Sequence, residues 1–140
     1  AVQAFGKLPI DCASLPIDLL TLSGHKIGAP KGIGALYVRR GTPLEPLLFG
    51  GAQDRGRRPG TENVAAAVAL ATAAELAVAE REESCARLAA LRERLETVIT
   101  EAAPEAQING RGAPRAPHIC SVTIMGLDGD ALLMGLDLQG

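Results

Sequence analysis

Apolar residues are arranged in two ways along the chain, in short continuous runs before position 40 and at helical spacing after position 60. The runs at 15–23 and 32–39 are rich in Leu, Ile and Val, which predicts two buried strands of the parallel type. The segment 24–31 between them contains glycine, proline and polar residues, which predicts a loop. Such a loop is a place where rigid strands can carry a site.

A long helical segment follows a flexible, cationic loop at 49–60. Residues 61–103 contain no Gly or Pro and are rich in Ala, Leu, Glu and Arg. Thr61 is the expected N-cap. The acidic stretch 80–83 predicts a bend, although its charges also suit a solvated face. Apolar residues three or four positions apart predict one apolar helix face: Leu88, Leu91, Leu95 and Val98.

The remaining residues predict a connection at 104–117, a strand at 118–125 and a short helix at 129–138. Strands mixed with long helices are typical of an α/β fold. We therefore expect an α/β protein.

Composition narrows the possible functions. The chain has 140 residues, a net charge of −2 and only 2% aromatic residues, so nothing indicates a nucleic-acid partner. No apolar run has the ~20 residues that a membrane span needs. The three cysteines lack metal or disulfide spacing, which indicates a reduced, cytoplasmic protein. Cys85 in a helical pattern and Cys120 in a strand pattern are interpreted as packing residues.

The loop after the first strand carries a possible reactive group. Ser23, His25 and Lys26 place a hydroxyl, an imidazole and an amine within four residues. A lysine that loses its proton can form a Schiff base with an aldehyde, and the other two groups can donate to a phosphate. The alternative is a solvated loop with a chance His-Lys pair, and these four residues alone do not exclude it.

A second candidate phosphate site lies at Gly60-Thr61, where a helix start would offer free N–H groups and a hydroxyl. The alternative there is an ordinary cap beside solvated arginines. The spacing of a P-loop or a dinucleotide fingerprint is missing. His25 and His118 have no partners at metal-binding spacing, so no metal site is expected.

The whole chain resembles the cysteine desulfurases, which are class V aminotransferase-like enzymes. The segment from Ser23 to Arg40, Ser-Gly-His-Lys-Ile-Gly-Ala-Pro-Lys-Gly-Ile-Gly-Ala-Leu-Tyr-Val-Arg-Arg, is similar to the family's cofactor-lysine segment. Residues 50–63, Gly-Gly-Ala-Gln-Asp-Arg-Gly-Arg-Arg-Pro-Gly-Thr-Glu-Asn, resemble the family's Gly-Gly-Gly-Gln-Glu-Arg-Gly-x-Arg-Ser-Gly-Thr-Glu-Asn. Residues 1–11 and 115–122 resemble further family segments.

The resemblance implies part of the large domain of the aminotransferase-like pyridoxal-phosphate fold, with the start of the small α+β domain. Residues 1–100 would complete the cofactor-binding large domain and a connecting helix, and residues 101–140 would begin the small C-terminal domain.

The resemblance also implies a cofactor, pyridoxal 5'-phosphate, and a role for each matching residue. Lys26 would be the catalytic lysine that holds the cofactor covalently, and Ser23 and His25 would hold its phosphate. Gln3 would bond the phenolic oxygen of the ring, and Thr61 would reach the phosphate in the other subunit of a homodimer.

The implied activity is conversion of L-cysteine to L-alanine with formation of an enzyme persulfide. The sulfur would pass to acceptor or iron–sulfur scaffold proteins. Alternatives are another class V enzyme, such as a selenocysteine lyase or an aminotransferase, and a non-catalytic dimerisation remnant.

Some family features have no counterpart here. The aspartate that pairs with the ring nitrogen would stand before Ala1, and the persulfide cysteine would follow Gly140. None of Cys12, Cys85 and Cys120 matches that cysteine. We expect a fragment of a longer enzyme, inactive by itself.

Overall fold

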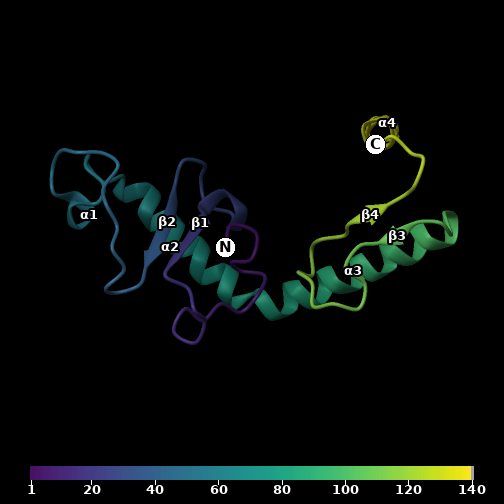
Figure 1. Ribbon diagram of the computed structural model, residues 1–140, viewed down its shortest axis with the longest axis horizontal. Helices are drawn as coiled ribbons and strands as arrows, with labels where there is room; N and C mark the ends of the chain where they lie inside the picture. Colours follow the sequence, from purple (N-terminus) through teal and green to yellow (C-terminus); the bar gives the residue numbers. More distant parts are fainter. Residues whose placement is uncertain (140) are drawn as a thin grey trace. The chain divides into compact units, whose positions relative to one another are not determined.

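Helices and strands are mixed along the chain, as the α/β prediction requires (Figure 1). The computed structural model describes residues 1–139. In chain order the elements are β1 (Leu19–Ser23), η1 (Gly24–Ile27), β2 (Gly34–Val38), α1 (Gln53–Gly56), α2 (Val64–Ala79), α3 (Arg81–Ala102), β3 (Gln107–Ile108), β4 (Val122–Thr123) and α4 (Gly129–Asp137).

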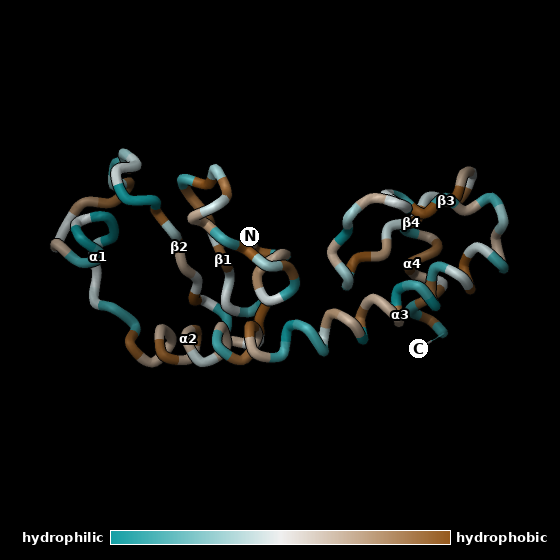
Figure 2. Tube along the Cα trace, turned by 90° about the horizontal axis from the view of Figure 1, so that it is seen from below, coloured by the Kyte–Doolittle hydropathy of each residue, from teal (hydrophilic) through white to brown (hydrophobic). Residues whose placement is uncertain are grey.

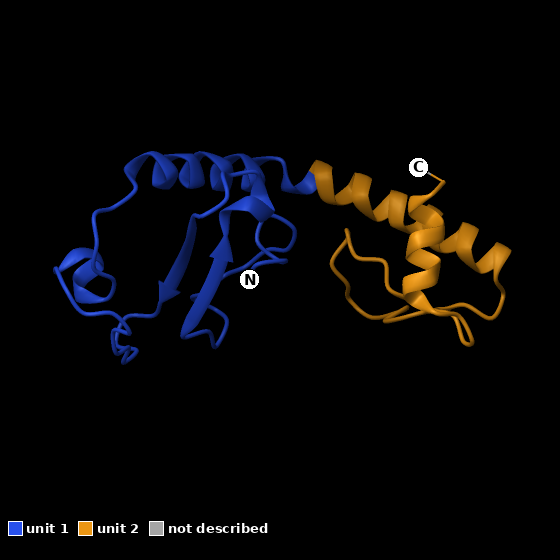
Figure 3. Ribbon diagram, turned by 90° about the horizontal axis from the view of Figure 1, so that it is seen from above, with its two compact units in different colours: residues 1–82 blue, residues 83–140 orange. Residues whose placement is uncertain are grey.

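The chain divides into two compact units between Glu82 and Glu83 (Figure 3). The first unit contains β1, β2 and α2, and the second contains most of α3 with β3, β4 and α4. The sequence predicts instead that the boundary between the large and the small domain lies after residue 100, with α3 as the connecting helix of the large domain. That domain assignment stays a prediction.

The first unit is built on a β1–β2 hairpin that runs antiparallel from Leu19 opposite Val38 to Ser23 opposite Gly34. The expectation of buried, parallel-type strands at 15–23 and 32–39 is wrong for this pair. Leu19 and Leu36 are each 47% exposed, because a two-stranded sheet has too little area to bury both of its faces. Both strands are also shorter than predicted.

Arg39 fixes the segment that precedes β1. Its guanidinium donates to the carbonyl oxygens of Cys12 (2.8 Å), Leu15 (2.7 Å) and Ile17 (2.9 Å). Its Nε also lies 3.4 Å from Oδ1 of Asp18. These bonds turn the chain at 12–18, which is why β1 begins at residue 19 and not at residue 15.

The long helical segment breaks at Glu80, between α2 and α3, as the acidic stretch predicts. The N-cap, however, is Asn63 and not Thr61, because the Asn63 side chain accepts from the backbone nitrogen of Ala66 at 3.1 Å. Asparagine is among the strongest N-cap residues, and it directly precedes the alanine-rich run. Thr61 therefore lies outside the helix.

Apolar residues are frequent along α2 (Figure 2), and several apolar side chains of the helices are exposed. The predicted apolar face of α3 is half exposed, at 51% for Leu91, 49% for Leu95 and 54% for Val98. Few apolar side chains are buried among the described residues, and two of the three are alanines: Ala29, Ala73 and Ile108. None of the helices between residues 1 and 139 combines the length and apolar character needed to span a bilayer.

The second unit differs from its prediction in the strands. The predicted strand at 118–125 contracts to β4, which pairs antiparallel with β3, a strand inside the predicted connection. Cys120 lies just before β4 and not in a strand. The predicted helix at 129–138 is α4, and the Asp128 carboxylate caps it by accepting from the backbone nitrogens of Asp130 and Ala131.

Candidate active site

The candidate site is the turn that follows β1. The chain leaves the strand at Ser23 and enters η1, so Lys26 lies in a 3-10 turn and not in an irregular loop. Gly28 ends this turn with a φ of 89°, a left-handed conformation that favours glycine. Backbone bonds close the turn from Gly24 nitrogen to Ile33 oxygen (2.9 Å) and from Ala29 nitrogen to Gly24 oxygen (3.0 Å).

Two of the predicted phosphate ligands contact each other in this turn. The Ser23 Oγ lies 2.8 Å from Nδ1 of His25, so one of these atoms donates to the other. His25 and Lys26 are both exposed, with their polar ends accessible to a ligand. The turn therefore presents a hydroxyl, an imidazole and an amine together, as the sequence predicts.

Gly24 makes this geometry possible. A Cβ atom added at Gly24 would lie 2.9 Å from Ile33 Cγ2, 3.0 Å from Ala29 Cβ and 3.0 Å from Ile33 oxygen. Such distances leave no room for a methyl group, so only glycine lets the two ends of the turn approach each other.

We expect Gly24→Ala in the intact protein to lower stability by roughly 1–3 kcal/mol, the usual cost of overpacking a tight site. Gly135→Ala is the matched control, because an added Cβ there meets nothing within 4 Å and alanine favours a helix. Chemical denaturation of both variants measures the difference. Equal stability of Gly24→Ala and wild type would show that the turn adapts.

Gln3 lies on a segment that is anchored beside the same end of the hairpin. The Ala1 nitrogen donates to the Thr21 carbonyl oxygen at 2.6 Å. A Cβ at Gly6 would lie 3.6 Å from Ile27 Cγ2 and 3.0 Å from Ala77 Cβ, so this segment packs between η1 and α2. The exposed Gln3 side chain lies between these two anchors. The segment that carries Gln3 therefore packs, at Gly6, against Ile27, the residue that follows Lys26.

Thr61 is not brought to this turn within one chain. The contact of Gly6 with Ile27 and Ala77 places Lys26 beside the C-terminal part of α2. Thr61 precedes the N-terminus of the same helix, and the fourteen residues from Val64 to Ala77 span about 20 Å at the α-helical rise. Thr61 is exposed at the far end of α2.

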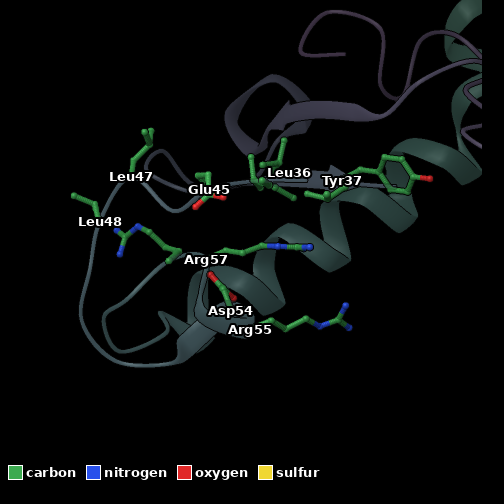
Figure 4. A pocket seen from close by; sticks show the side chains of 12 residues that line it. Leu36, Tyr37, Glu45, Leu47, Leu48, Asp54, Arg55 and Arg57 are labelled. Atoms are coloured by element: carbon green, nitrogen blue, oxygen red, sulfur yellow. The ribbon is translucent and has the colours of Figure 1, made fainter. Parts of the chain in front are cut away.

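A pocket of about 940 Å³ lies elsewhere in the first unit, between β2 and the loop after it (Figure 4). Leu36 and Tyr37 of β2 form one wall, and Asp54, Arg55 and Arg57 line the other. Neither Ser23, His25 nor Lys26 lines it. Because the pocket holds none of the candidate Schiff-base chemistry, we assign the site to the η1 turn.

Sequence reasoning missed several residues that shape this unit. Arg39 is visible in the sequence only as a charge at a strand end, and Gly24 only as a small residue in a loop. Their roles depend on contacts with segments that are distant in the chain. Asn63 did have a detectable signal, since it stands immediately before the helical run.

Pyridoxal phosphate is the group that the sequence resemblance implies, and the η1 turn fits it chemically. Its phosphate requires donors, and the side chains of Ser23 and His25, whose Oγ and Nδ1 atoms lie 2.8 Å apart, would be able to donate to it. Its aldehyde requires a lysine amine, which Lys26 supplies from the same turn.

Comparison with known proteins identifies relatives that match this chain along its whole length. A cysteine desulfurase from Trichormus azollae is 47% identical over all 140 residues of the chain, which cover 35% of that protein. A cysteine desulfurase IscS from Methanosarcina thermophila is 49% identical over the same residues, which cover 34% of its length. The X-ray structure of a NifS-like protein from Rickettsia africae superimposes on 98% of this chain and 38% of its own, with a TM-score of 0.91 and 35% identity.

The family described as aminotransferase class V matches residues 1–140, and the chain spans about a third of the length of its curated relatives. The structural match confirms that these residues form part of the fold of the NifS-like proteins. The chain belongs to the class V aminotransferase family.

Proposed function

We propose that the protein containing this chain is a pyridoxal-phosphate-dependent cysteine desulfurase, which converts L-cysteine to L-alanine and keeps the sulfur as an enzyme persulfide. The observation that carries the proposal is the η1 turn, where Lys26 follows the Ser23–His25 pair at the end of β1. The identity of 47–49% to proteins named cysteine desulfurase supports the choice of substrate. Formation of alanine from L-cysteine by the intact protein tests it.

Each site residue has a defined role in this proposal. Ser23 and His25 donate to the cofactor phosphate, and Gln3 donates to the phenolic oxygen of its ring. Lys26 anchors the cofactor, and its amine then takes and returns the proton at the substrate Cα. When bound, pyridoxal phosphate supplies an electron sink for that carbon.

Thr61 acts, in this proposal, on the phosphate bound by the other subunit of a homodimer. The distance of about 20 Å along α2 supports this arrangement, because Thr61 cannot approach a cofactor held at Lys26 of its own chain. The N–H groups beside Thr61 precede the positive end of the α2 dipole, which favours an anion.

We expect Thr61→Ala in the intact protein to weaken cofactor binding by roughly 1–3 kcal/mol, the cost of one lost hydrogen bond to a charged group. A heterodimer of one Lys26→Ala chain and one Thr61→Ala chain separates the two arrangements. If Thr61 acts across the interface, both lesions fall in one site and the other site binds cofactor with native affinity. Titration of that heterodimer measures the affinity, and absence of a native site would place Thr61 in its own subunit's site.

Sulfur-acceptor or iron–sulfur scaffold proteins are the proposed recipients of the persulfide sulfur. We also propose a cytoplasmic location, since Cys12, Cys85 and Cys120 are all reduced cysteines and a reducing compartment keeps them reduced.

The three cysteines of this chain are not the persulfide carrier in this proposal. The Cys12 carbonyl accepts from Arg39 at the end of the hairpin opposite η1, and the five residues of β1, about 16 Å of strand, lie between that end and the turn that carries Lys26.

We expect the intact protein with Cys12, Cys85 and Cys120 all changed to Ser to keep alanine formation within a few-fold of wild type. Some loss of stability is expected, since all three side chains are partly buried. The alanine assay is accompanied by a cofactor content measurement. Loss of activity in a folded, cofactor-loaded triple variant would assign the sulfur chemistry to one of them.

A further inference from the structure

Asn109 has an unusual combination of sequence and contacts in the second unit. The sequence contains two asparagines, Asn63 and Asn109, and only Asn109 is followed by glycine. Asn109 and Gly110 are exposed directly after β3. Gly110 has a φ of 71° and no Cβ, so its backbone nitrogen is unhindered toward the Asn109 side chain.

The Asn109 side chain ties β3 to β4. Its Nδ2 donates to Ser121 Oγ at 3.0 Å and to Thr123 Oγ1 at 3.1 Å. Its backbone nitrogen donates to the Ser121 carbonyl oxygen at 2.8 Å. The pairing that these bonds extend is short, since only Gln107 and Ile108 pair with Thr123 and Val122.

We propose that Asn109 is a site of spontaneous deamidation, and that the bonds from its side chain to Ser121 and Thr123 restrain the reaction in the folded protein. This inference is independent of the proposed enzyme activity. The Gly110 nitrogen attacks Asn109 Cγ, the Cγ–Nδ2 bond breaks, and Nδ2 leaves as ammonia with the proton from Gly110. Water then opens the cyclic imide to aspartate or isoaspartate.

The bonds restrain this reaction for two reasons. While Nδ2 donates to both hydroxyls, the side-chain amide is held toward β4, and Cγ cannot turn toward the Gly110 nitrogen. Departure of ammonia also requires both bonds to break. The reaction therefore proceeds from the opened form of the β3–β4 pair.

The product loosens the unit that contains it. Isoaspartate lengthens the backbone beside Ile108, whose side chain is only 9% exposed. The added carboxylate also cannot donate to the hydroxyls of Ser121 and Thr123. The modified chain consequently loses the two bonds from Nδ2 that extend the short β3–β4 pairing.

The test is incubation of the intact protein in mildly alkaline buffer, followed by peptide mass spectrometry and an isoaspartate assay. We expect slow modification at Asn109 and none at Asn63, where the β-branched Val64 hinders attack. Thr123→Val combined with Ser121→Ala should raise the rate at Asn109 several-fold. The matched control Thr123→Ser keeps the hydroxyl and should stay near the wild-type rate.

Asp128 also precedes a glycine, Gly129, and its isomerisation would produce isoaspartate too. That isomerisation releases no ammonia and changes no mass, so ammonia release identifies deamidation. The unfolding temperature of aged protein should fall with its isoaspartate content at residue 109. The unfolding temperature of Asn109→Ser protein, aged in the same way, should fall less. Equal rates at Asn109 in wild type and the Thr123→Val, Ser121→Ala variant would overturn the proposal. So would modification at Asn63 in place of Asn109.

Discussion

The intact protein carrying Lys26→Ala is expected to lose conversion of L-cysteine to alanine by at least about a hundred- to ten-thousand-fold, the usual contribution of a positioned acid–base group. The loss follows from the geometry of η1, which holds the Lys26 amine in the same turn as the Ser23–His25 pair. Lys26→Arg should be equally inactive, because a guanidinium is not deprotonated in proteins. Alanine formation is the measurement.

Lys31→Ala is the control for this prediction. Lys31 is exposed on the same loop and follows Pro30, so its removal changes the local charge as Lys26→Ala does. It lies beyond η1, however, and we expect nearly wild-type turnover. If Lys26→Ala stayed active and Lys31→Ala lost activity, our assignment of the chemistry to Lys26 would be wrong.

The second large effect is expected in the buried ion-pair cluster of Arg92, Glu96 and Arg115. The Glu96 side chain is 6% exposed and accepts from Arg115 through both oxygens, at 2.7 and 3.2 Å. Arg92 Nε lies 3.6 Å from Glu96 Oε1, and its Nη1 donates to the Ala116 carbonyl oxygen at 3.3 Å. The cluster therefore fastens the segment 115–116 to α3.

Removing one partner from a buried charge cluster is destabilising, because the remaining charges lose their compensation. Glu96→Leu leaves two guanidiniums with side-chain exposures of only 13% and 18%, so we expect a loss of several degrees in unfolding temperature. Arg115→Met should cost less, since Arg92 remains beside Glu96. The exposed Glu93, at 71%, provides the control, and Glu93→Gln should be nearly neutral.

This cluster also predicts a pH dependence. The hydrogen bonds from Arg115 hold the pKa of Glu96 below its ordinary value. A depressed carboxyl pKa contributes stability above the unfolded-state pKa, and that contribution is lost as the pH falls through the folded-state value. The unfolding temperature should therefore fall as the pH drops below the ordinary pKa of a glutamate. It should fall less steeply in Glu96→Gln. An unchanged slope in Glu96→Gln would show that other groups cause the fall.

The long helices α2 and α3 were predictable from the sequence, whereas α1, which lies inside the loop predicted at 49–60, was not, and the strands were predictable only in part. Residues 61–103 contain no helix breaker, so α2 and α3 follow from local propensity, and the acidic stretch 80–83 indicates the bend at Glu80. The limits of β1 depend on the Arg39 bonds to residues 12–17, and β3 depends on pairing with β4. These are contacts between segments distant in sequence, which local patterns do not contain.

The candidate site shows the same division. Ser23, His25 and Lys26 are neighbours in sequence, so their joint presentation in one turn could be anticipated. Thr61 was predicted as a helix cap from its residue type, but the stronger cap Asn63 takes that position. The separation of Thr61 from Lys26 emerged only when the length and direction of α2 were known.

Borohydride reduction of the cofactor-loaded intact protein tests the central claim most directly, because the reagent fixes pyridoxal phosphate to the lysine amine that holds it. Peptide mass spectrometry then locates the attached group. The account predicts labelling at Lys26 and none at Lys7 or Lys31, which are the other lysines of this chain. Labelling at Lys7 or Lys31, with Lys26 unmodified, would contradict it.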